Sequence, residues 1–253
     1  MDKKRIAYNI AAPILGCILF IAIWFALSAI VGTSLILPTP AETVRRFFLL
    51  LGEGSFYTAV GRTLLRSVLA FLIAFVLATG FAVLSARFAF FRKVFSPFTV
   101  ILRVMPTISV ILLVLVWFRS LVAPYVVTFL VIFPMLYTTV LHAIDGVDPL
   151  LKEMTEAYRF STRKKVFSFY IPQMMPAVLT GVSITLSFTV KLTIAAEVLS
   201  YERNSIGHFM QRAATYLETE TLLAWTIAAI LLGFLLEGLV LFVKKIIVRH
   251  YHG

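Results

Sequence analysis

Six long apolar runs dominate this sequence and restrict what it can fold into. They cover residues 9–31, 63–86, 94–118, 121–143, 174–200 and 222–243. A spanning α-helix needs about 20 predominantly apolar residues, whereas a spanning β-strand is about half as long and has one polar face. The sequence therefore predicts an all-α integral membrane protein with about six transmembrane helices, forming a single membrane domain over residues 1–253.

The composition excludes a water-soluble fold. Hydrophobic residues make up 60% of the 253 residues, charged residues make up 14%, and the mean hydropathy is +0.97. Soluble domains are about half apolar and about a quarter charged, so lipid must solvate much of this surface. The single cysteine, Cys17, provides neither a disulfide framework nor a thiolate metal site within one chain.

The first apolar run could be mistaken for a secretory signal peptide. It follows a basic start, and Ala26-Leu27-Ser28 resembles a cleavage site. However, the run is longer than the roughly 7–15 apolar residues of a signal core. We therefore expect it to form the first spanning helix.

The positions of the basic residues predict the orientation of the chain. Short cytoplasmic loops of membrane proteins hold an excess of Lys and Arg. With the N-terminus inside, the inner segments contain most of the 23 Lys and Arg residues. They are Lys3, Lys4, Arg5, Arg87, Arg92, Lys93, Lys152, Arg159, Arg163, Lys164, Lys165, Lys244, Lys245 and Arg249. Both termini are therefore predicted to be cytoplasmic.

The first outer connection contains a helix start signal. In Leu37-Pro38-Thr39-Pro40-Ala41-Glu42-Thr43, Thr39 can cap a helix that begins at Pro40, and Glu42 can close a capping box. We expect a short amphipathic helix over residues 40–52 along the outer membrane face. Its simplest role is that of an interfacial anchor.

The long inner connection, residues 145–172, is predicted to be a helix–turn–helix. Asp148-Pro149 starts a charged helix, Ser161-Thr162 breaks it, and a basic and aromatic run leads to Ile171-Pro172. Such an exposed element could serve as a handle for a partner protein. Charge alone favours a simpler interpretation, a solvated loop that follows the positive-inside rule.

Within this loop the chain resembles a known family. Glu156-Ala157-Tyr158 through Ile171-Pro172-Gln173-Met174-Met175-Pro176 is similar to the EAA loop of ABC-importer permeases that contain the binding-protein-dependent transport domain. The segments Leu37-Pro38-Thr39-Pro40, Leu102-Arg103-Val104-Met105-Pro106 and Ile194-Ala195-Ala196-Glu197 are similar too, in the same order. The most similar branch is that of the nitrate, sulfonate, taurine and bicarbonate permeases, which also includes vitamin-precursor importers.

The resemblance implies a type I importer permease, a transport subunit of the bacterial inner membrane rather than an enzyme. The chain lacks a Gly-rich phosphate loop ending in Gly-Lys-Ser/Thr, so ATP and Mg²⁺ are expected in a separate ATPase, and this chain is expected to bind no cofactor and no metal. The expected partners are a second permease copy in a homodimer, two cytoplasmic ATPases, an extracytoplasmic solute-binding protein and lipid, but no nucleic acid.

The resemblance also implies which residues form the ATPase-coupling loop, and the sequence of this loop differs from the family pattern at one point. Residues expected in the ATPase-coupling loop are Glu153, Glu156, Ala157, Tyr158, Arg159, Phe160, Ser161, Thr162, Arg163 and Lys164. The family loop has a Gly at the break between its two short helices, whereas this chain does not. Gly takes positive φ without strain, so the turn here must differ or be held by Ser161 and Thr162.

The fifth predicted helix is polar on two faces. At 100° per residue, Ser183, Ser187 and Lys191 share one face, and three Thr residues lie nearly opposite. Such a helix is expected in the interior of a dimer. A charge such as Lys191 within a spanning helix normally faces a cavity or a partner, although snorkelling to the outer interface is an alternative. Glu197 is expected at the outer mouth.

Arg103 is the other basic candidate for the translocation pathway. It lies about ten residues into the third predicted helix, close to the kink expected at Pro106, although it could instead pack against backbone carbonyls. If Arg103 and Lys191 both face the pathway, its positive field favours anions. The expected substrate is a small anion such as a sulfonate, taurine or nitrate, passed inward by alternating access, with a neutral riboflavin- or thiamine-pyrimidine-like compound as the alternative.

Two other classes of function remain open on sequence grounds. A channel or ATP-independent carrier would need no loop handle, and copurification with an ATPase would separate it from an importer. An intramembrane enzyme would need catalytic pairs, and the sequence contains neither a His-Glu-x-x-His motif nor paired intramembrane Asp residues.

Overall fold

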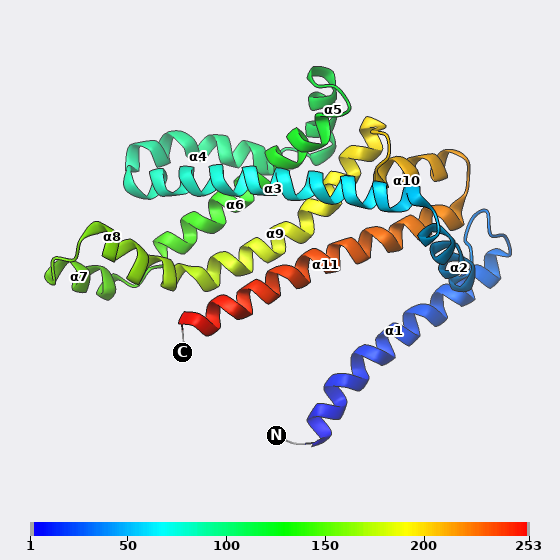
Figure 1. Ribbon diagram of the computed structural model, residues 1–253, viewed down its shortest axis with the longest axis horizontal. Coiled ribbons are helices and arrows are strands. Elements are labelled where there is room, and N and C mark those ends of the chain that lie inside the picture. The colour runs from blue at the N-terminus through cyan, green and yellow to red at the C-terminus, as the bar shows by residue number, and fades with distance from the viewer. Residues whose placement is uncertain (1–2, 252–253) are drawn as a thin grey trace.

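The computed structural model describes the backbone of residues 3–251 and the side chains of residues 11–242 and 245. Within this range all regular structure is helical (Figure 1). The elements are α1 (Lys3–Val31), α2 (Pro40–Leu51), α3 (Gly54–Arg87), α4 (Ala89–Val104), α5 (Thr107–Trp117), α6 (Ala123–Asp145), α7 (Pro149–Ala157), α8 (Thr162–Lys165), the π-helical turn η1 (Val166–Tyr170), α9 (Ile171–Ser200), α10 (Ile206–Thr215) and α11 (Thr219–Tyr251). Lys3, Lys4, Arg5, Lys244 and Arg249, which the orientation argument used, lie outside the described side chains.

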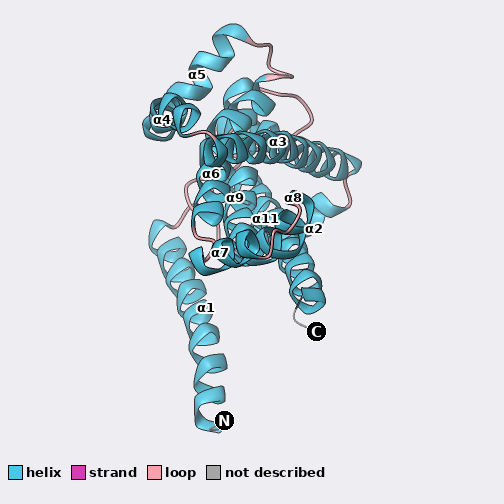
Figure 2. Cartoon of the chain, turned by 90° about the vertical axis from the view of Figure 1, so that its left-hand side faces the viewer, coloured by secondary structure: helices cyan, strands magenta, loops and turns pink. Residues whose placement is uncertain are grey.

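The number of spanning helices agrees with the sequence prediction. Five helices of the described chain are long and apolar enough to cross a membrane, and the bent pair α4–α5 makes up to six. The helices α3, α6, α9 and α11 form the bundle, in which α6 packs between α3 and α9, and α9 packs on α11 (Figures 1 and 2). The helices α7 and α8 lie at one end of this bundle, and α2 and α10 lie at the opposite end.

Small residues allow the close packing of α3 on α6. Ala70, Ala74, Ala78 and Ala82 recur every four residues along α3 and are all buried. Helices in lipid associate through such small-residue stripes because their backbones can approach closely. At the end of this contact, Tyr137 of α6 donates a 2.8 Å hydrogen bond to Ser85 of α3.

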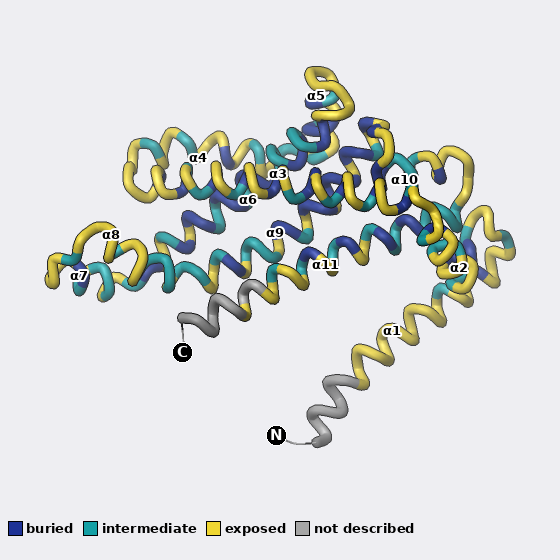
Figure 3. Tube along the Cα trace, viewed as in Figure 1, coloured by how far each residue is buried: buried dark blue, intermediate teal, exposed yellow. Residues whose placement is uncertain are grey.

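The first helix stands apart from the bundle. Along α1 the described residues are almost all exposed, and the helix diverges from the others (Figure 3). Its last turns are tied to the following connection by Trp24 Nε1, which donates to the Pro38 carbonyl at 3.0 Å, and by Ser28 Oγ, which donates to the Leu37 carbonyl at 2.9 Å. An apolar helix whose described residues are so exposed needs lipid or another subunit around it.

The third predicted span is broken rather than kinked. The axes of α4 and α5 differ by 101°, with Met105 and Pro106 at the break. Proline disfavours α-helical torsions in the residue before it, and Met105 indeed has ψ 129°. Pro106 also lacks the N–H that would continue the helix. The sequence predicted only a loosened turn, so the break is a correction.

The short helix predicted over residues 40–52 is present. Thr39 N donates to Glu42 Oε2 at 2.7 Å, and Glu42 N donates to Thr39 Oγ1 at 3.2 Å, which completes the capping box. The helix α2 then runs over Pro40–Leu51 and packs on α11.

Candidate coupling loop and translocation groove

The connection over residues 145–172 is a helix–turn–helix, as predicted. Asp148 Oδ1 accepts a 2.8 Å hydrogen bond from Leu150 N, so Asp148 is the N-cap of α7. The helix ends at Ala157, and Ser161 caps α8, which continues through the π-helical turn into α9. The loop is thereby attached directly to the fifth spanning helix.

The break between α7 and α8 explains how the chain manages without the family glycine. Arg159 itself adopts the left-handed conformation, with φ 49°. A non-glycine residue there costs about 1–2 kcal/mol. The turn is held by backbone hydrogen bonds from Arg159 N to the Glu156 carbonyl at 2.9 Å and from Phe160 N to the Thr155 carbonyl at 3.1 Å. Arg159 thus takes the positive φ, and Ser161 acts as the cap that follows.

Aromatic stacking joins the two halves of the loop. The Phe160 ring stacks on Phe169 at 5.3 Å and on Tyr158 at 5.9 Å. Lys164 Nζ lies 4.3 Å from the centre of the Phe160 ring, a cation–π contact. These contacts connect the end of α7 to the turn that precedes α9, so a force on the loop would reach α9 through packed groups.

Most of the predicted coupling residues face solvent in the described chain. The exposed ones are Glu153, Glu156, Ala157, Tyr158, Arg159, Ser161, Thr162, Arg163 and Lys164, whereas Phe160 is half-buried. Beside the loop, Arg92 of α4 forms a bidentate ion pair with Asp145 at the end of α6, at 2.8 and 3.2 Å. The loop therefore presents a charged surface, and the Arg92–Asp145 ion pair links α4 to the end of α6 where the loop begins.

The two polar faces of α9 serve different purposes. Thr185, Thr189 and Thr193 are buried, and each hydroxyl donates to the carbonyl four residues earlier at 2.7–3.0 Å. Thr193 also contacts Thr128 of α6, with 3.1 Å between the two hydroxyl oxygens. This face is therefore the contact of α9 with α6, and its hydroxyls are satisfied within the chain.

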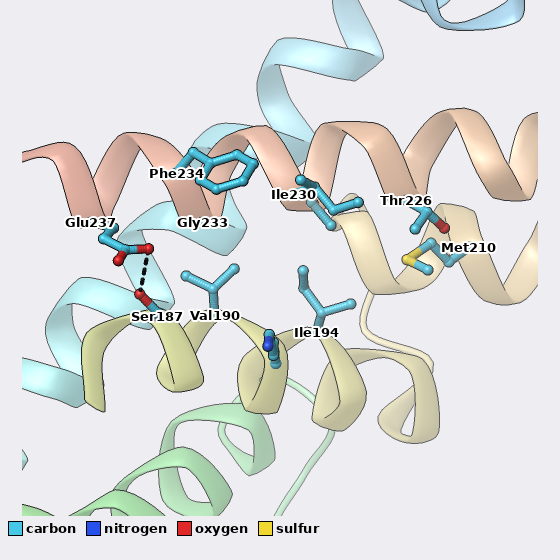
Figure 4. Close-up of a pocket in the computed structure, with 11 residues that line it drawn as sticks. Ser187, Val190, Ile194, Met210, Thr226, Ile230, Gly233, Phe234 and Glu237 are labelled. Atoms are coloured by element: carbon cyan, nitrogen blue, oxygen red, sulfur yellow. Dashed lines mark hydrogen bonds between the residues drawn. The ribbon is translucent and has the colours of Figure 1, made fainter. Parts of the chain in front are cut away.

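The opposite face of α9 borders a groove of about 420 Å³. Its lining comes from α9, α10 and α11 and is mostly apolar (Figure 4). Ser187 Oγ donates to Glu237 Oε2 at 3.3 Å or to the Ser183 carbonyl at 3.2 Å. Lys191 also lines the groove, is exposed, and has no hydrogen bond or ion pair with another described residue.

The other two pathway candidates lie elsewhere. Arg103 is exposed on the last turn of α4 and does not line this groove, so the structure does not bring it to Lys191. Glu197 was expected at an outer mouth but is completely buried. Its carboxylate accepts hydrogen bonds from Thr63 Oγ1 at 2.9 Å, Arg66 Nη1 at 2.9 Å and Gly207 N at 3.2 Å.

This buried polar cluster contains residues that the sequence analysis missed. Arg66 also pairs with Glu202, with Nη2 2.7 Å from Oε1, and Thr63 Oγ1 accepts from Ile206 N at 3.1 Å. The signal in the sequence was the presence of a basic residue inside one apolar run and of an acidic residue inside another, because such groups must pair in lipid. The cluster joins α3, α9 and α10.

Comparisons with known proteins agree with this architecture. Residues 77–250 match the family described as the binding-protein-dependent transport system inner membrane component. A chain in a solved structure of the methionine ABC transporter MetNI, in inward-facing conformations, has the same fold: the TM-score is 0.66 at 16% identity, over 75% of this chain and 94% of that one.

Similar sequences point to the same family. A probable ABC transporter permease of Brucella melitensis is 24% identical over 219 residues, which cover 85% of this chain and 87% of the relative. The taurine transport system permease protein TauC of Escherichia coli is 22% identical over 224 residues, covering 86% and 81%. A putative ABC transporter permease of Methanocaldococcus jannaschii is 22% identical over 243 residues, covering 94% and 89%.

The family match covers more than half of the chain and includes the loop over residues 145–172, the groove and the helices that carry them. Family membership implies ATPase subunits and a binding protein as partners, and a multi-pass location in the inner membrane. The chain belongs to the binding-protein-dependent transport system inner membrane components and is the permease subunit of an ABC importer, not an enzyme.

Proposed function

We propose that this permease imports a small organic compound with an anionic group, such as a sulfonate or taurine, by alternating access. It works as a homodimer with two ATPases and an extracytoplasmic binding protein, with both termini in the cytoplasm. Closure of the ATPases displaces the loop formed by residues 145–172. The helix α9 transmits this displacement to the membrane dimer and shifts its equilibrium between inward-open and outward-open states. The permease itself binds no ATP and no Mg²⁺.

The observation that carries the anion proposal is the position of Lys191. A charge within the hydrocarbon costs at least about 2.5–3.5 kcal/mol and normally faces a cavity or a counter-ion. Lys191 borders a groove and forms no ion pair with another described residue. An anionic substrate would supply the missing charge, and the similarity to the taurine permease TauC supports this class of substrate.

The experiment is uptake by the importer, reconstituted in vesicles with its ATPases and binding protein. Lys191→Met should lower the maximal rate of taurine uptake at least about tenfold, because the pathway loses its counter-charge. Lys93→Met is the matched control, since Lys93 is an exposed lysine on α4, away from the groove. Unchanged uptake by Lys191→Met would refute the role of Lys191, and uptake of a neutral vitamin precursor instead of anions would refute the substrate class.

A further inference from the structure

The groove between α9 and α11 contains two opposite charges that do not meet. Lys191 and Glu237 both line it, but no ion pair joins them among the described residues. Glu237 uses Oε2 to accept from Ser187, while Oε1 has no donor in the described chain. The Lys191 ammonium and the Glu237 Oε1 atom can therefore each form further hydrogen bonds with a compound in the groove.

Both charges belong to spanning helices, so their positions need an explanation. Lys191 lies in the candidate span Thr162–Ser200, and Glu237 lies in the candidate span Thr219–Phe242. Ionisable groups at such positions face a cavity, a substrate route or one another. The two described residues do not pair with each other, which leaves both available to a compound that binds in the groove.

The spacing of the charges limits what can bridge them. Ser187 contacts Glu237, and Lys191 follows Ser187 by four residues on the same helix. Four residues correspond to about 6 Å along the helix axis. The groove wall next to Glu237 is apolar and includes Val190 of α9 and Phe234 of α11 (Figure 4). This wall suits a short aliphatic spacer between two charged ends.

We propose that the groove binds a small zwitterion whose acidic group meets Lys191 and whose ammonium group meets Glu237. The proposal rests on the anion import proposed above and narrows it. A plain anion would be repelled by the Glu237 carboxylate and would bring no donor for its Oε1, whereas an amino sulfonate or a short amino acid satisfies both charges. Discrimination would arise because a site built for two charges rejects a compound that carries only one.

The test compares two compounds that differ only in the amine. Uptake of taurine and of ethanesulfonate is measured in the reconstituted importer at saturating binding protein. Glu237→Gln should lower the ratio of taurine to ethanesulfonate uptake at least about tenfold relative to wild type. The same binding protein is used with the variant and with wild type. Its own preference between taurine and ethanesulfonate therefore cancels when the two uptake ratios are compared. Glu53→Gln is the matched control, since Glu53 is exposed and does not line the groove.

A second measurement requires no variant. Binding of radiolabelled taurine and β-alanine, each a zwitterion with a short spacer, is measured with the wild-type permease–ATPase complex in nanodiscs without binding protein. Ethanesulfonate should compete at least about tenfold more weakly than unlabelled taurine. Equal competition by the two compounds, or no binding of either zwitterion, overturns the proposal.

The two proposals fail in different ways. If Glu237→Gln leaves the uptake ratio unchanged while Lys191→Met still lowers the uptake of both compounds, the zwitterion proposal is wrong and the anion proposal stands. If Lys191→Met changes neither rate, the anion proposal fails as well.

Discussion

Arg66 Nη1 lies 2.9 Å from Glu197 Oε1, with both side chains buried in the described bundle. The same guanidinium reaches Glu202 at 2.7 Å, so one positive charge holds two carboxylates. Burying charges is costly, and removing one partner of a buried pair costs about 3–5 kcal/mol because the other is left uncompensated. The cluster is therefore a sensitive point of the fold, at the place where α3, α9 and α10 meet.

The first prediction concerns the asymmetry of this cluster. Arg66→Met leaves two buried carboxylates unpaired and should destabilise the protein by about 3 kcal/mol or more. Glu197→Gln should cost less, because Glu202 still balances Arg66. Thermal unfolding of each purified variant in detergent gives its unfolding midpoint, and the midpoints rank the variants by stability. Arg62→Met, on the same helix but exposed, should remain close to wild type, and equal midpoints for Arg62→Met and Arg66→Met would contradict the prediction.

The second prediction concerns Gly207, at the first turn of α10. A Cβ atom there would lie 2.5 Å from Glu197 Cβ and 2.7 Å from the Ile194 carbonyl oxygen. Such contacts force α10 away from α9 and weaken the hydrogen bond from Gly207 N to the Glu197 carboxylate. Gly207→Ala should therefore lower the unfolding midpoint, with a cost of about 1–3 kcal/mol as for other overpacked sites.

Gly61 provides the control for this substitution. It lies on α3, where an added Cβ atom would meet no other atom within 4 Å. Gly61→Ala should raise stability slightly, by about 0.5–1 kcal/mol, since glycine is unfavourable inside a helix. A Gly207→Ala variant as stable as Gly61→Ala would show that α10 does not need this close approach.

Local patterns explain why much of the fold could be predicted. The capping box of Thr39 and Glu42 and the Asp148 cap depend on neighbours within three residues, so the sequence displays them directly. The two faces of α9 follow from helical periodicity alone. The break at Pro106 was only half predicted, because a proline indicates a disturbed helix but packing against α6 and α9 decides how far α5 turns.

Contacts between distant segments could not be predicted in the same way. Arg66 and Glu197 are 131 residues apart in the sequence, and nothing in either run indicates which acidic group will meet which basic one. Glu197 was therefore expected at the outer mouth and not in a buried pair with Arg66. Likewise, Ser187 and Glu237 meet across 50 residues, and only the packing of α9 on α11 brings Glu237 to the groove.

The third prediction tests the coupling loop. Glu156 is exposed at the end of α7 and makes no side-chain contact with another described residue that would require its charge. Glu156→Lys should preserve membrane insertion but reduce substrate-stimulated ATP hydrolysis and uptake at least about tenfold, because reversing the charge opposes docking of the ATPase. Lys93→Glu reverses a charge on α4 outside the loop and should leave both rates close to wild type. Normal transport by Glu156→Lys would show that its charge is not part of the docking surface.

The last prediction tests the orientation with a matched pair of cysteine probes. Thr162 begins α8 and Thr215 ends α10; both side chains are exposed, and they lie at opposite ends of the bundle (Figure 1). In a Cys17→Ala background, a membrane-impermeant maleimide applied to intact spheroplasts should label Thr215→Cys and not Thr162→Cys. Permeabilising the membrane should make both sites reactive, because both side chains are exposed in the described chain. The basic loop would then lie in the cytoplasm, as the excess of Lys and Arg requires. The reverse pattern in intact spheroplasts would place the loop outside, where no ATPase could reach it, and would overturn the proposed coupling together with the topology.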